Sequence, residues 1–142
     1  MRLLRLKKPV TYTDYVRPIC LPLNESQRAK VNETLYTSGW GTPAFNISGR
    51  AVKKRFAHTL QSIMLKGDNT TQMCFSPQNE NNTVCQGDDG GPLMYSRRKK
   101  WFVEGIANTE DTKFSCNNPN EEACATRITP VNIEWILLNM EP

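Results

Sequence analysis

Turn-forming residues divide this 142-residue chain into short apolar runs. Pro18 and Pro22 exclude a helix over Tyr15–Leu23, so this segment is expected to be an extended connector. The next run, Thr34–Trp40, stops at Gly41. Short apolar runs between such signals are typical of an all-β domain. The length suits one domain with its own core and is too short for two ordinary ones.

The remaining runs predict further strands and one terminal helix. The strands are a strand end at Arg2–Leu6, then Leu60–Leu65, Pro92–Tyr95 and Trp101–Ala107 around the polar tip Ser96–Lys100, and Ala123–Thr129. Thr129 caps and Pro130 opens a helix through Met140. Val131, Trp135 and Leu138 share one helical face, which is expected to pack on the strands. This order predicts a β-barrel with a helical lid.

Composition narrows the functional class only slightly. Hydrophobic residues make up 38% and charged residues 23%, as in a soluble globular protein, and the net charge of +4 does not indicate nucleic-acid binding. No apolar run approaches the ~20 residues of a membrane-spanning helix. The opening MRLLRLKKPV lacks the uninterrupted apolar stretch of a signal peptide.

Five Asn-x-Ser/Thr sequons indicate passage through a secretory pathway, where the attached glycans mark surface loops; they begin at Asn24, Asn32, Asn46, Asn69 and Asn81. The Asn, Ser and Thr content would give about two such triplets by chance. A composition rich in Asn and Thr is the alternative explanation. Extracellular localisation would require an upstream leader, which this chain does not contain.

The segment CQGDDGGP, Cys85–Pro92, predicts a tight glycine-lined turn that presents one side chain to a substrate. That side chain is Asp89, and Asp88 precedes it. Several motifs in order resemble the second half of a trypsin/chymotrypsin-like serine protease domain: VRPICLP (16–22), SGWG (38–41), CQGDDGGPL (85–93), WFVEGIA (101–107), Cys116 and ATRITPVNIEWI (125–136). VRPICLP further resembles extracellular cascade proteases, including arthropod clip-domain proteases.

The resemblance implies a fold for residues 1–142: the second antiparallel β-barrel of a trypsin-like domain, with a C-terminal α-helix and the last strand of the first barrel. LLRLKKPV resembles the segment that follows the family's catalytic aspartate. The catalytic histidine, the catalytic aspartate and the rest of the first barrel are therefore expected upstream of this chain.

The resemblance also implies that the nucleophile has been lost. The family's turn reads Gly-Asp-Ser-Gly-Gly-Pro, and Asp89 occupies the serine position. A carboxylate attacking an amide would form an anhydride with no base to reverse it. The oxyanion-hole donors would be the backbone N–H groups of Gly87 and Asp89, and a resident carboxylate beside them would repel a developing anion. No catalytic residue is assigned, and the chain is expected to be a pseudoenzyme.

Asp88 matches the aspartate that pairs with the new N-terminal ammonium on activation. A lone buried carboxylate would tend to protonate, and the alternative is that water reaches it. The specificity-pocket positions also depart from the family. Thr83 is neutral at the pocket base, Asn108-Thr109-Glu110 replaces Ser-Trp-Gly with Glu110 as an obstruction, and Ala123 replaces a pocket-wall glycine.

The resemblance implies a Cys85–Cys116 disulfide, and it makes Cys20 the cysteine that links to an upstream segment or another chain. Cys74 lacks its usual partner, so pairing with Cys124 on the neighbouring strand is proposed, against the alternative of two free buried thiols. His58 is the only histidine and is interpreted as a surface residue. No second ligand lies at suitable spacing, so neither a metal site nor a cofactor is predicted.

Three functions are compatible with this sequence. The first is a secreted, catalytically inactive serine protease homologue that binds proteins of an extracellular proteolytic cascade or the N-terminal half of the domain. The second is a truncated fragment or incomplete gene product of a trypsin-like endopeptidase. The third is a glycoprotein that binds anionic polysaccharide through Lys53–Arg55 and Arg97–Lys100, which otherwise form solvated hairpin tips.

Overall fold

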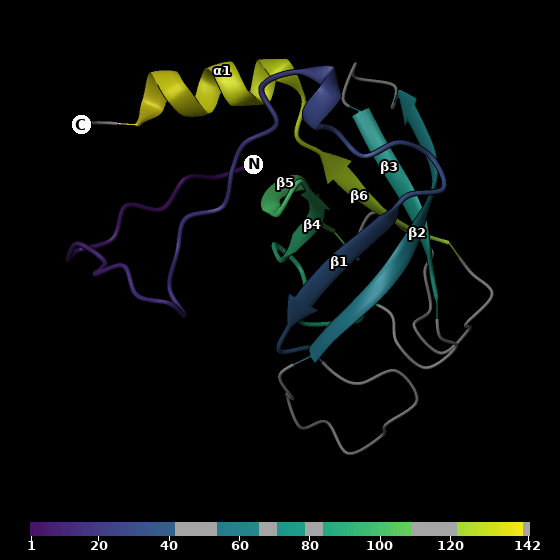
Figure 1. Ribbon diagram of the computed structural model, residues 1–142, viewed down its shortest axis with the longest axis horizontal. Coiled ribbons are helices and arrows are strands. Elements are labelled where there is room, and N and C mark those ends of the chain that lie inside the picture. Colours follow the sequence, from purple (N-terminus) through teal and green to yellow (C-terminus); the bar gives the residue numbers. More distant parts are fainter. Residues whose placement is uncertain (42–53, 66–70, 79–83, 109–121, 141–142) are drawn as a thin grey trace.

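The computed structural model describes residues 1–41, 54–65, 71–78, 84–108 and 122–140. Six strands close into an antiparallel barrel in the order β1-β2-β3-β6-β5-β4 (Figure 1). Their bounds are β1 Thr34–Gly39, β2 Lys54–Leu65, β3 Thr71–Pro77, β4 Pro92–Arg97, β5 Lys100–Ala107 and β6 Ala123–Arg127. A short 3-10 helix, η1 (Glu25–Gln27), precedes β1, and α1 (Pro130–Asn139) ends the described chain. The predicted barrel with a terminal helix is confirmed.

The core fills the barrel with side chains from every strand. Leu35, Leu60, Met73 and Leu93 have no exposed surface, and Phe75 is nearly as buried. Burial of large aliphatic and aromatic side chains is the main favourable contribution to folding, at roughly 1.5–3 kcal/mol each. The six strands therefore close around one continuous apolar core that fixes the positions of the loops between them.

Two predicted elements differ from the structure. Arg2–Leu6 forms no regular element and is exposed, as is the rest of the chain through Ile19. β2 begins at Lys54, well before the predicted Leu60, and pairs with β1 from Thr59 back to Lys54. The predicted connector Tyr15–Leu23 is confirmed as non-helical, and it touches the barrel through a parallel bridge between Cys20 and Phe102.

Helix α1 starts where the sequence predicts and packs through a different face. Thr129 N–H donates to Asn132 Oδ1 at 2.9 Å, and Asn132 N–H donates to Thr129 Oγ1 at 3.3 Å, a reciprocal cap before Pro130. Ile133 and Ile136 are the buried residues. The expectation that Val131, Trp135 and Leu138 pack on the strands is wrong, because these side chains are 72%, 40% and 78% exposed.

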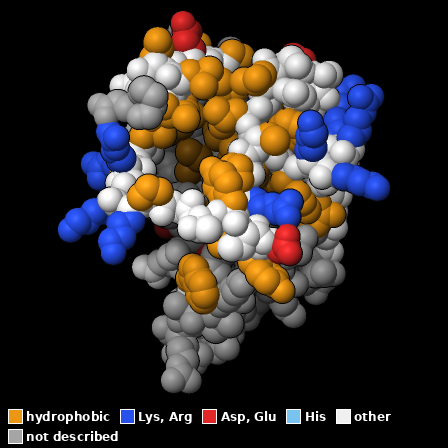
Figure 2. Space-filling view, turned by 60° about the vertical axis from the view of Figure 1, so that its left-hand side comes forward, with side chains coloured by type: hydrophobic (Ala, Val, Ile, Leu, Met, Phe, Trp, Pro, Cys, Tyr) orange, Lys and Arg blue, Asp and Glu red, His pale blue; other side chains and the backbone are white. Residues whose placement is uncertain are grey.

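Figure 1 shows α1 extending sideways from the barrel, on the side where the N-terminal arm (residues 1–19) runs. Figure 2 shows hydrophobic side chains gathered on this face, with Lys and Arg side chains at its edges. No described helix has the length and apolar character needed to cross a membrane.

Candidate functional site

The turn that leads into β4 needs glycine at two positions. Gly87 and Gly90 adopt φ values of +90° and +78°, which L-residues with side chains rarely adopt. Asp88 N–H donates to the Cys85 carbonyl at 2.9 Å, and Gly91 N–H donates to the Asp88 carbonyl at 3.0 Å. Two consecutive hydrogen-bonded turns that share Asp88 result, and Asp89 is exposed in the second of them.

The end of β5 fixes this turn in place. Gly90 N–H donates to the Ala107 carbonyl, and Ala107 N–H donates to the Gly91 carbonyl, both at 2.8 Å. Asn108 follows Ala107 directly and is half-buried. The segment before Asn108 is thus held against the turn that carries Asp89.

The Asp88 carboxylate lies under the turn and is 4% exposed. Its Oδ1 accepts the Gly41 N–H at 2.8 Å, and its Oδ2 accepts the Cys85 N–H at 2.9 Å. Hydrogen bonds from backbone N–H groups stabilise a buried carboxylate. In this structure Asp88 is therefore buried, and backbone N–H groups of the chain bind both of its carboxylate oxygens.

Two glycines leave room for the Asp88 side chain: Gly39, the last residue of β1, and Gly41 just after the strand. A Cβ atom on Gly39 would collide with Asp88 Oδ1, and one on Gly41 would lie 2.6 Å from Asp88 Cγ. A hollow of ≈ 340 Å³ opens beside them, and Trp40 at its edge is 65% exposed. Its lining is Ser38, Gly39, Trp40, Gly87, Asp88, Asp89, Gly90, Gly91 and Pro92.

The structure describes only part of the predicted specificity pocket. Ala123 is buried at the start of β6 and pairs with Phe75. Thr83, Thr109 and Glu110 lie outside the described residues. Their assignment, and the role of the Gly87 and Asp89 N–H groups as oxyanion donors, stay predictions.

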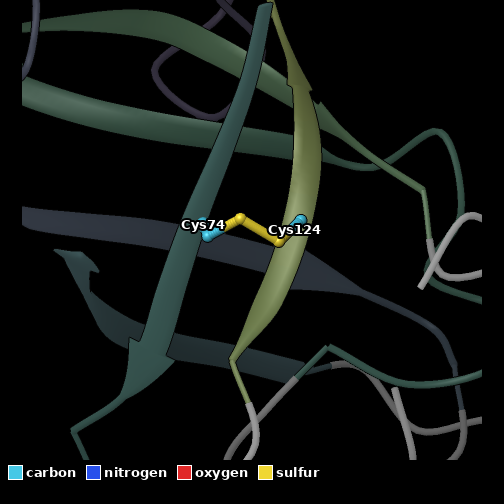
Figure 3. Close-up of a disulfide and its surroundings, with 2 residues drawn as sticks. All are labelled: Cys74 and Cys124. Atoms are coloured by element: carbon cyan, nitrogen blue, oxygen red, sulfur yellow. A yellow bond between two sulfur atoms is a disulfide. The ribbon is translucent and has the colours of Figure 1, made fainter. Parts of the chain in front are cut away.

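Cys74 and Cys124 form a disulfide between paired positions of β3 and β6, with Cα atoms 4.1 Å apart (Figure 3). The proposed pairing is therefore present, and the alternative of two free thiols is not. Cys85 is also disulfide-bonded, and its expected partner, Cys116, lies outside the described residues. Cys20 is a half-buried free thiol.

Sequence reasoning missed a buried acid in the middle of β5. Glu104 has no exposed surface, and its Oε1 accepts the Ala29 N–H at 2.7 Å. Its Oε2 lies 3.5 Å from Arg127 Nε and 3.8 Å from Arg28 Nη1. Burial raises the pKa of the Glu104 carboxyl despite these partners. The signal was available, because Glu104 is the one charged residue inside the apolar run WFVEGIA.

Arg28 completes this buried group. Its Nη1 donates to the Ile128 carbonyl at 2.7 Å, just before α1 begins. The Glu104 carbonyl also accepts the Ile128 N–H at 2.8 Å. The segment that follows η1, β5 and the entry to α1 are thereby joined by one set of polar contacts.

The described residues contain no group of three or more His, Cys, Asp or Glu side chains able to hold a metal ion. The backbone of His58 belongs to β2 and pairs with Leu35 and Pro77. Asn24 and Asn32 are exposed, whereas the sequons at Asn46, Asn69 and Asn81 and the tract Lys53–Arg55 fall wholly or partly outside the described residues.

A closed antiparallel barrel that ends in a helix and holds a double turn against β5 defines the class of chymotrypsin-like domains. The family model described as Trypsin matches residues 1–136, and the chain belongs to this family. It is 33% identical to CLIP domain-containing serine protease B9 of Anopheles gambiae over 98% of the chain and 35% of that protein. It is 28% identical to human Transmembrane protease serine 11B, over 94% of the chain and 33% of that protein. The chain thus spans about a third of these relatives.

Proposed function

We propose that this trypsin-family chain is a non-catalytic homologue that acts by binding other proteins. The observation that supports this most directly is Asp89, which is exposed at the centre of the glycine-lined turn where the family carries its serine. The segment around Asp89 forms two hydrogen-bonded turns with glycines at positive φ. A scaffold for a presented side chain is therefore there, and the proposed difference from the family lies in the chemistry of that side chain.

The chemistry of Asp89 argues against an alternative catalytic role. Attack of its carboxylate on a peptide carbonyl would give a mixed anhydride, whose turnover needs a base to activate water. The sole histidine, His58, lies on β2, which pairs with β1 and β3 and not with β4 or β5. A carboxylate next to the Gly87 N–H would also oppose the anionic tetrahedral intermediate that the family stabilises there.

Three further observations support a binding role in an extracellular protease cascade. Similarity to the relative named as a CLIP domain-containing serine protease supports a protease setting. The exposed Asn24 and Asn32 and the disulfides suit an oxidising, glycosylating compartment. The broad apolar face beside α1 suits a protein partner, either another cascade protein or the N-terminal half of a trypsin-like domain.

The test restores the serine and asks whether activity returns. The full chain and its Asp89→Ser variant are incubated with a broad peptide library and with a serine-directed covalent inhibitor, and Asp89→Asn serves as the control. We expect no hydrolysis and no labelling, because triad residues act as a unit and one restored member recovers little.

A second arm joins Asp89→Ser to a trypsin-like first barrel that carries the histidine and the aspartate. We expect at most trace hydrolysis from this fusion until Glu110 is also changed to Gly. Inhibitor-sensitive cleavage by Asp89→Ser alone would show that the site is a protease site one residue from activity, and cleavage by the unmodified chain would overturn the proposal outright.

A further inference from the structure

The turn between β4 and β5 consists of two cationic residues in an unusual backbone conformation. Arg97 pairs with Lys100, so the turn itself is only Arg98 and Lys99. Their φ values are +49° and +63°. Two-residue hairpin turns with both residues at positive φ strongly favour Asn and Gly, because other side chains crowd the backbone there. The chain therefore keeps two long cations where they are locally unfavourable.

The four basic residues of this tip, Arg97–Lys100, divide into two groups. Arg97 is half-buried and fixed by three partners: its Nε donates to Tyr95 Oη at 2.7 Å, its Nη1 donates to the Ser26 carbonyl at 2.7 Å, and it pairs with Glu33 at 3.2 Å. Arg98, Lys99 and Lys100 are exposed, and within the described part of the chain none of them forms an ion pair. Of the four residues Arg97–Lys100 that the sequence suggested for polysaccharide binding, Arg97 is therefore engaged within the protein.

A hollow of ≈ 300 Å³ lies between η1 and this tip. We call it the η1 hollow, and its lining is Ser26, Gln27, Arg97, Arg98, Lys100 and Phe102. Among the described residues, no carboxylate lines it. The acids nearest to this lining in sequence are already paired: Glu25 with Arg28 at 3.3 Å, Glu104 with Arg127 at 3.5 Å and Glu33 with Arg97 at 3.2 Å. The η1 hollow is thus a positively charged recess beside a buried aromatic ring, without an internal counter-ion.

Gln27 adds a neutral donor to the η1 hollow. Its Oε1 accepts the Leu23 N–H at 2.8 Å and the Asn24 N–H at 3.3 Å, which fixes the side-chain amide. With its oxygen committed to the backbone, the amide is left with its NH2 group as a donor. A guanidinium, an ammonium and an amide NH2 together are three kinds of donor with no acceptor among them, a set suited to an oxyanion.

We propose that the η1 hollow binds a sulfate group of a sulfated polysaccharide, with Arg98 and Lys100 as the cationic ligands and the Gln27 amide as the third donor. The planar guanidinium of Arg98 can engage two oxygens at once and is weakly hydrated, which favours a weakly hydrated sulfate ester. A free sulfate ion is held weakly at an open surface that salt screens, whereas a polysaccharide chain can also contact the neighbouring Lys99. This site is independent of the non-catalytic role and of Asp89.

The experiment measures binding of the full chain to a heparin-derived octasaccharide as salt is varied, by titration calorimetry. The test variant is Arg98→Gln/Lys100→Gln, and the control is Lys7→Gln/Lys8→Gln, which removes the same charge from the exposed arm. Arg97 is left intact because its contacts are structural. We expect the test variant to bind at least about tenfold more weakly at low salt, with a log–log salt slope smaller by about two.

A second variant, Gln27→Glu, keeps the oxygen that accepts the Leu23 N–H and replaces the donor with a negative charge. It should lose most of the affinity, while the single control Lys8→Gln, with the same change in net charge, should lose little. Inorganic sulfate, hyaluronan octasaccharide and a DNA duplex of equal charge complete the ligand set.

The proposal stands if the sulfated octasaccharide binds best and only the hollow variants weaken it. It is overturned if the control variants lose affinity equally, because net charge alone would then explain binding. Equal binding of hyaluronan or DNA would overturn the preference for sulfate. Binding of inorganic sulfate with the same affinity as the octasaccharide would overturn the polysaccharide as the ligand. No binding of the octasaccharide by the unmodified chain would overturn the proposal as a whole.

Discussion

Gly41 donates its backbone N–H to Asp88 Oδ1 at 2.8 Å across 47 positions of the sequence. This contact joins the end of β1 to the turn that carries Asp89, and Cys85 N–H binds the other carboxylate oxygen. Asp88, which we expect to match the aspartate of the family's activation pair, is here bound by backbone donors. The shape of the turn consequently depends on a side chain beneath it.

We expect Asp88→Ala to destabilise the chain by about 2–4 kcal/mol, because two buried N–H groups lose a charged acceptor. Asp88→Asn retains one acceptor oxygen and should cost less. Urea unfolding at neutral pH measures both. An Asp88→Ala variant as stable as the parent chain would contradict the role assigned to this carboxylate.

Replacing Cys74 and Cys124 together with Ser should lower the free energy of unfolding by about 4 kcal/mol, given the 50-residue separation of the two cysteines. Non-reducing peptide mapping first establishes the connectivity, including the expected Cys85–Cys116 bridge. Cys20→Ser is the matched control and should leave stability nearly unchanged. A map that joined Cys85 to Cys20 would contradict the family alignment.

The stability of the chain should depend on pH through Glu33. Burial acts to raise its pKa, but the Lys30 N–H, Tyr95 and Arg97 outweigh burial and hold the pKa below its ordinary 4.5. A group whose pKa is lower in the folded chain than in the unfolded chain stabilises the fold at pH values above its unfolded-state pKa. This stabilisation is lost as the pH falls through the folded-state pKa. Urea midpoints should therefore separate the parent from Glu33→Gln most above pH 4.5 and converge in stronger acid. A constant separation would refute this.

The raised pKa of Glu104 acts in the opposite direction. The contribution of Glu104 to the free energy of unfolding is fully present at pH values below its unfolded-state pKa. It is lost as the pH rises through the raised folded-state pKa. Because Glu104 is common to both chains in the Glu33 experiment, its effect cancels there.

Glycans should occupy Asn24 and Asn32 when the chain is made in a secretory host, since both side chains are exposed. Ser26→Ala and Thr34→Ala remove the two sequons separately, and Gln27→Ala is a neighbouring control that leaves both intact. Mass spectrometry before and after enzymatic deglycosylation reads the occupancy of each site. An unmodified Asn24 in such a host would weaken the case for secretion.

The isolated chain should self-associate through the apolar side of α1, where Leu137 and Leu138 are 55% and 78% exposed. Light scattering after size exclusion should show a mass that rises with concentration. Leu137→Lys/Leu138→Lys should suppress the rise, whereas Tyr15→Lys on the exposed arm should not. A monomer with a sharp thermal transition at all concentrations would be the contrary result.

The sequence was most informative where local signals agree. Thr129 and Pro130 mark the start of α1 because capping is a property of adjacent residues. The buried face of α1 was not predictable in the same way. Its sequence, PVNIEWILLN, is apolar on several sides, so helical spacing alone does not show whether the face with Val131 or the face with Ile133 packs on the barrel. The early part of β2 was missed because KKRFAHT lacks a regular alternation of apolar and polar residues.

The candidate site shows the same division. The Cys85–Pro92 turn was predictable from its glycines, since positive φ is a local requirement. The clamp of Asp88 by Gly41 was not, because closure of the barrel brings these residues together. The role of Arg97 was likewise hidden, since its partners Ser26 and Glu33 lie more than sixty positions away along the chain.

The bridge between Cys20 and Phe102 also sets how the barrel would carry a mechanical load. Cys20 N–H donates to the Trp101 carbonyl and its carbonyl accepts the Val103 N–H, both at 3.0 Å. A pull along the connector would load these two hydrogen bonds in shear, and the force would enter at β5. Because β5 is paired with both β4 and β6, tension on a polypeptide tethered at Cys20 would spread into two strands of the barrel.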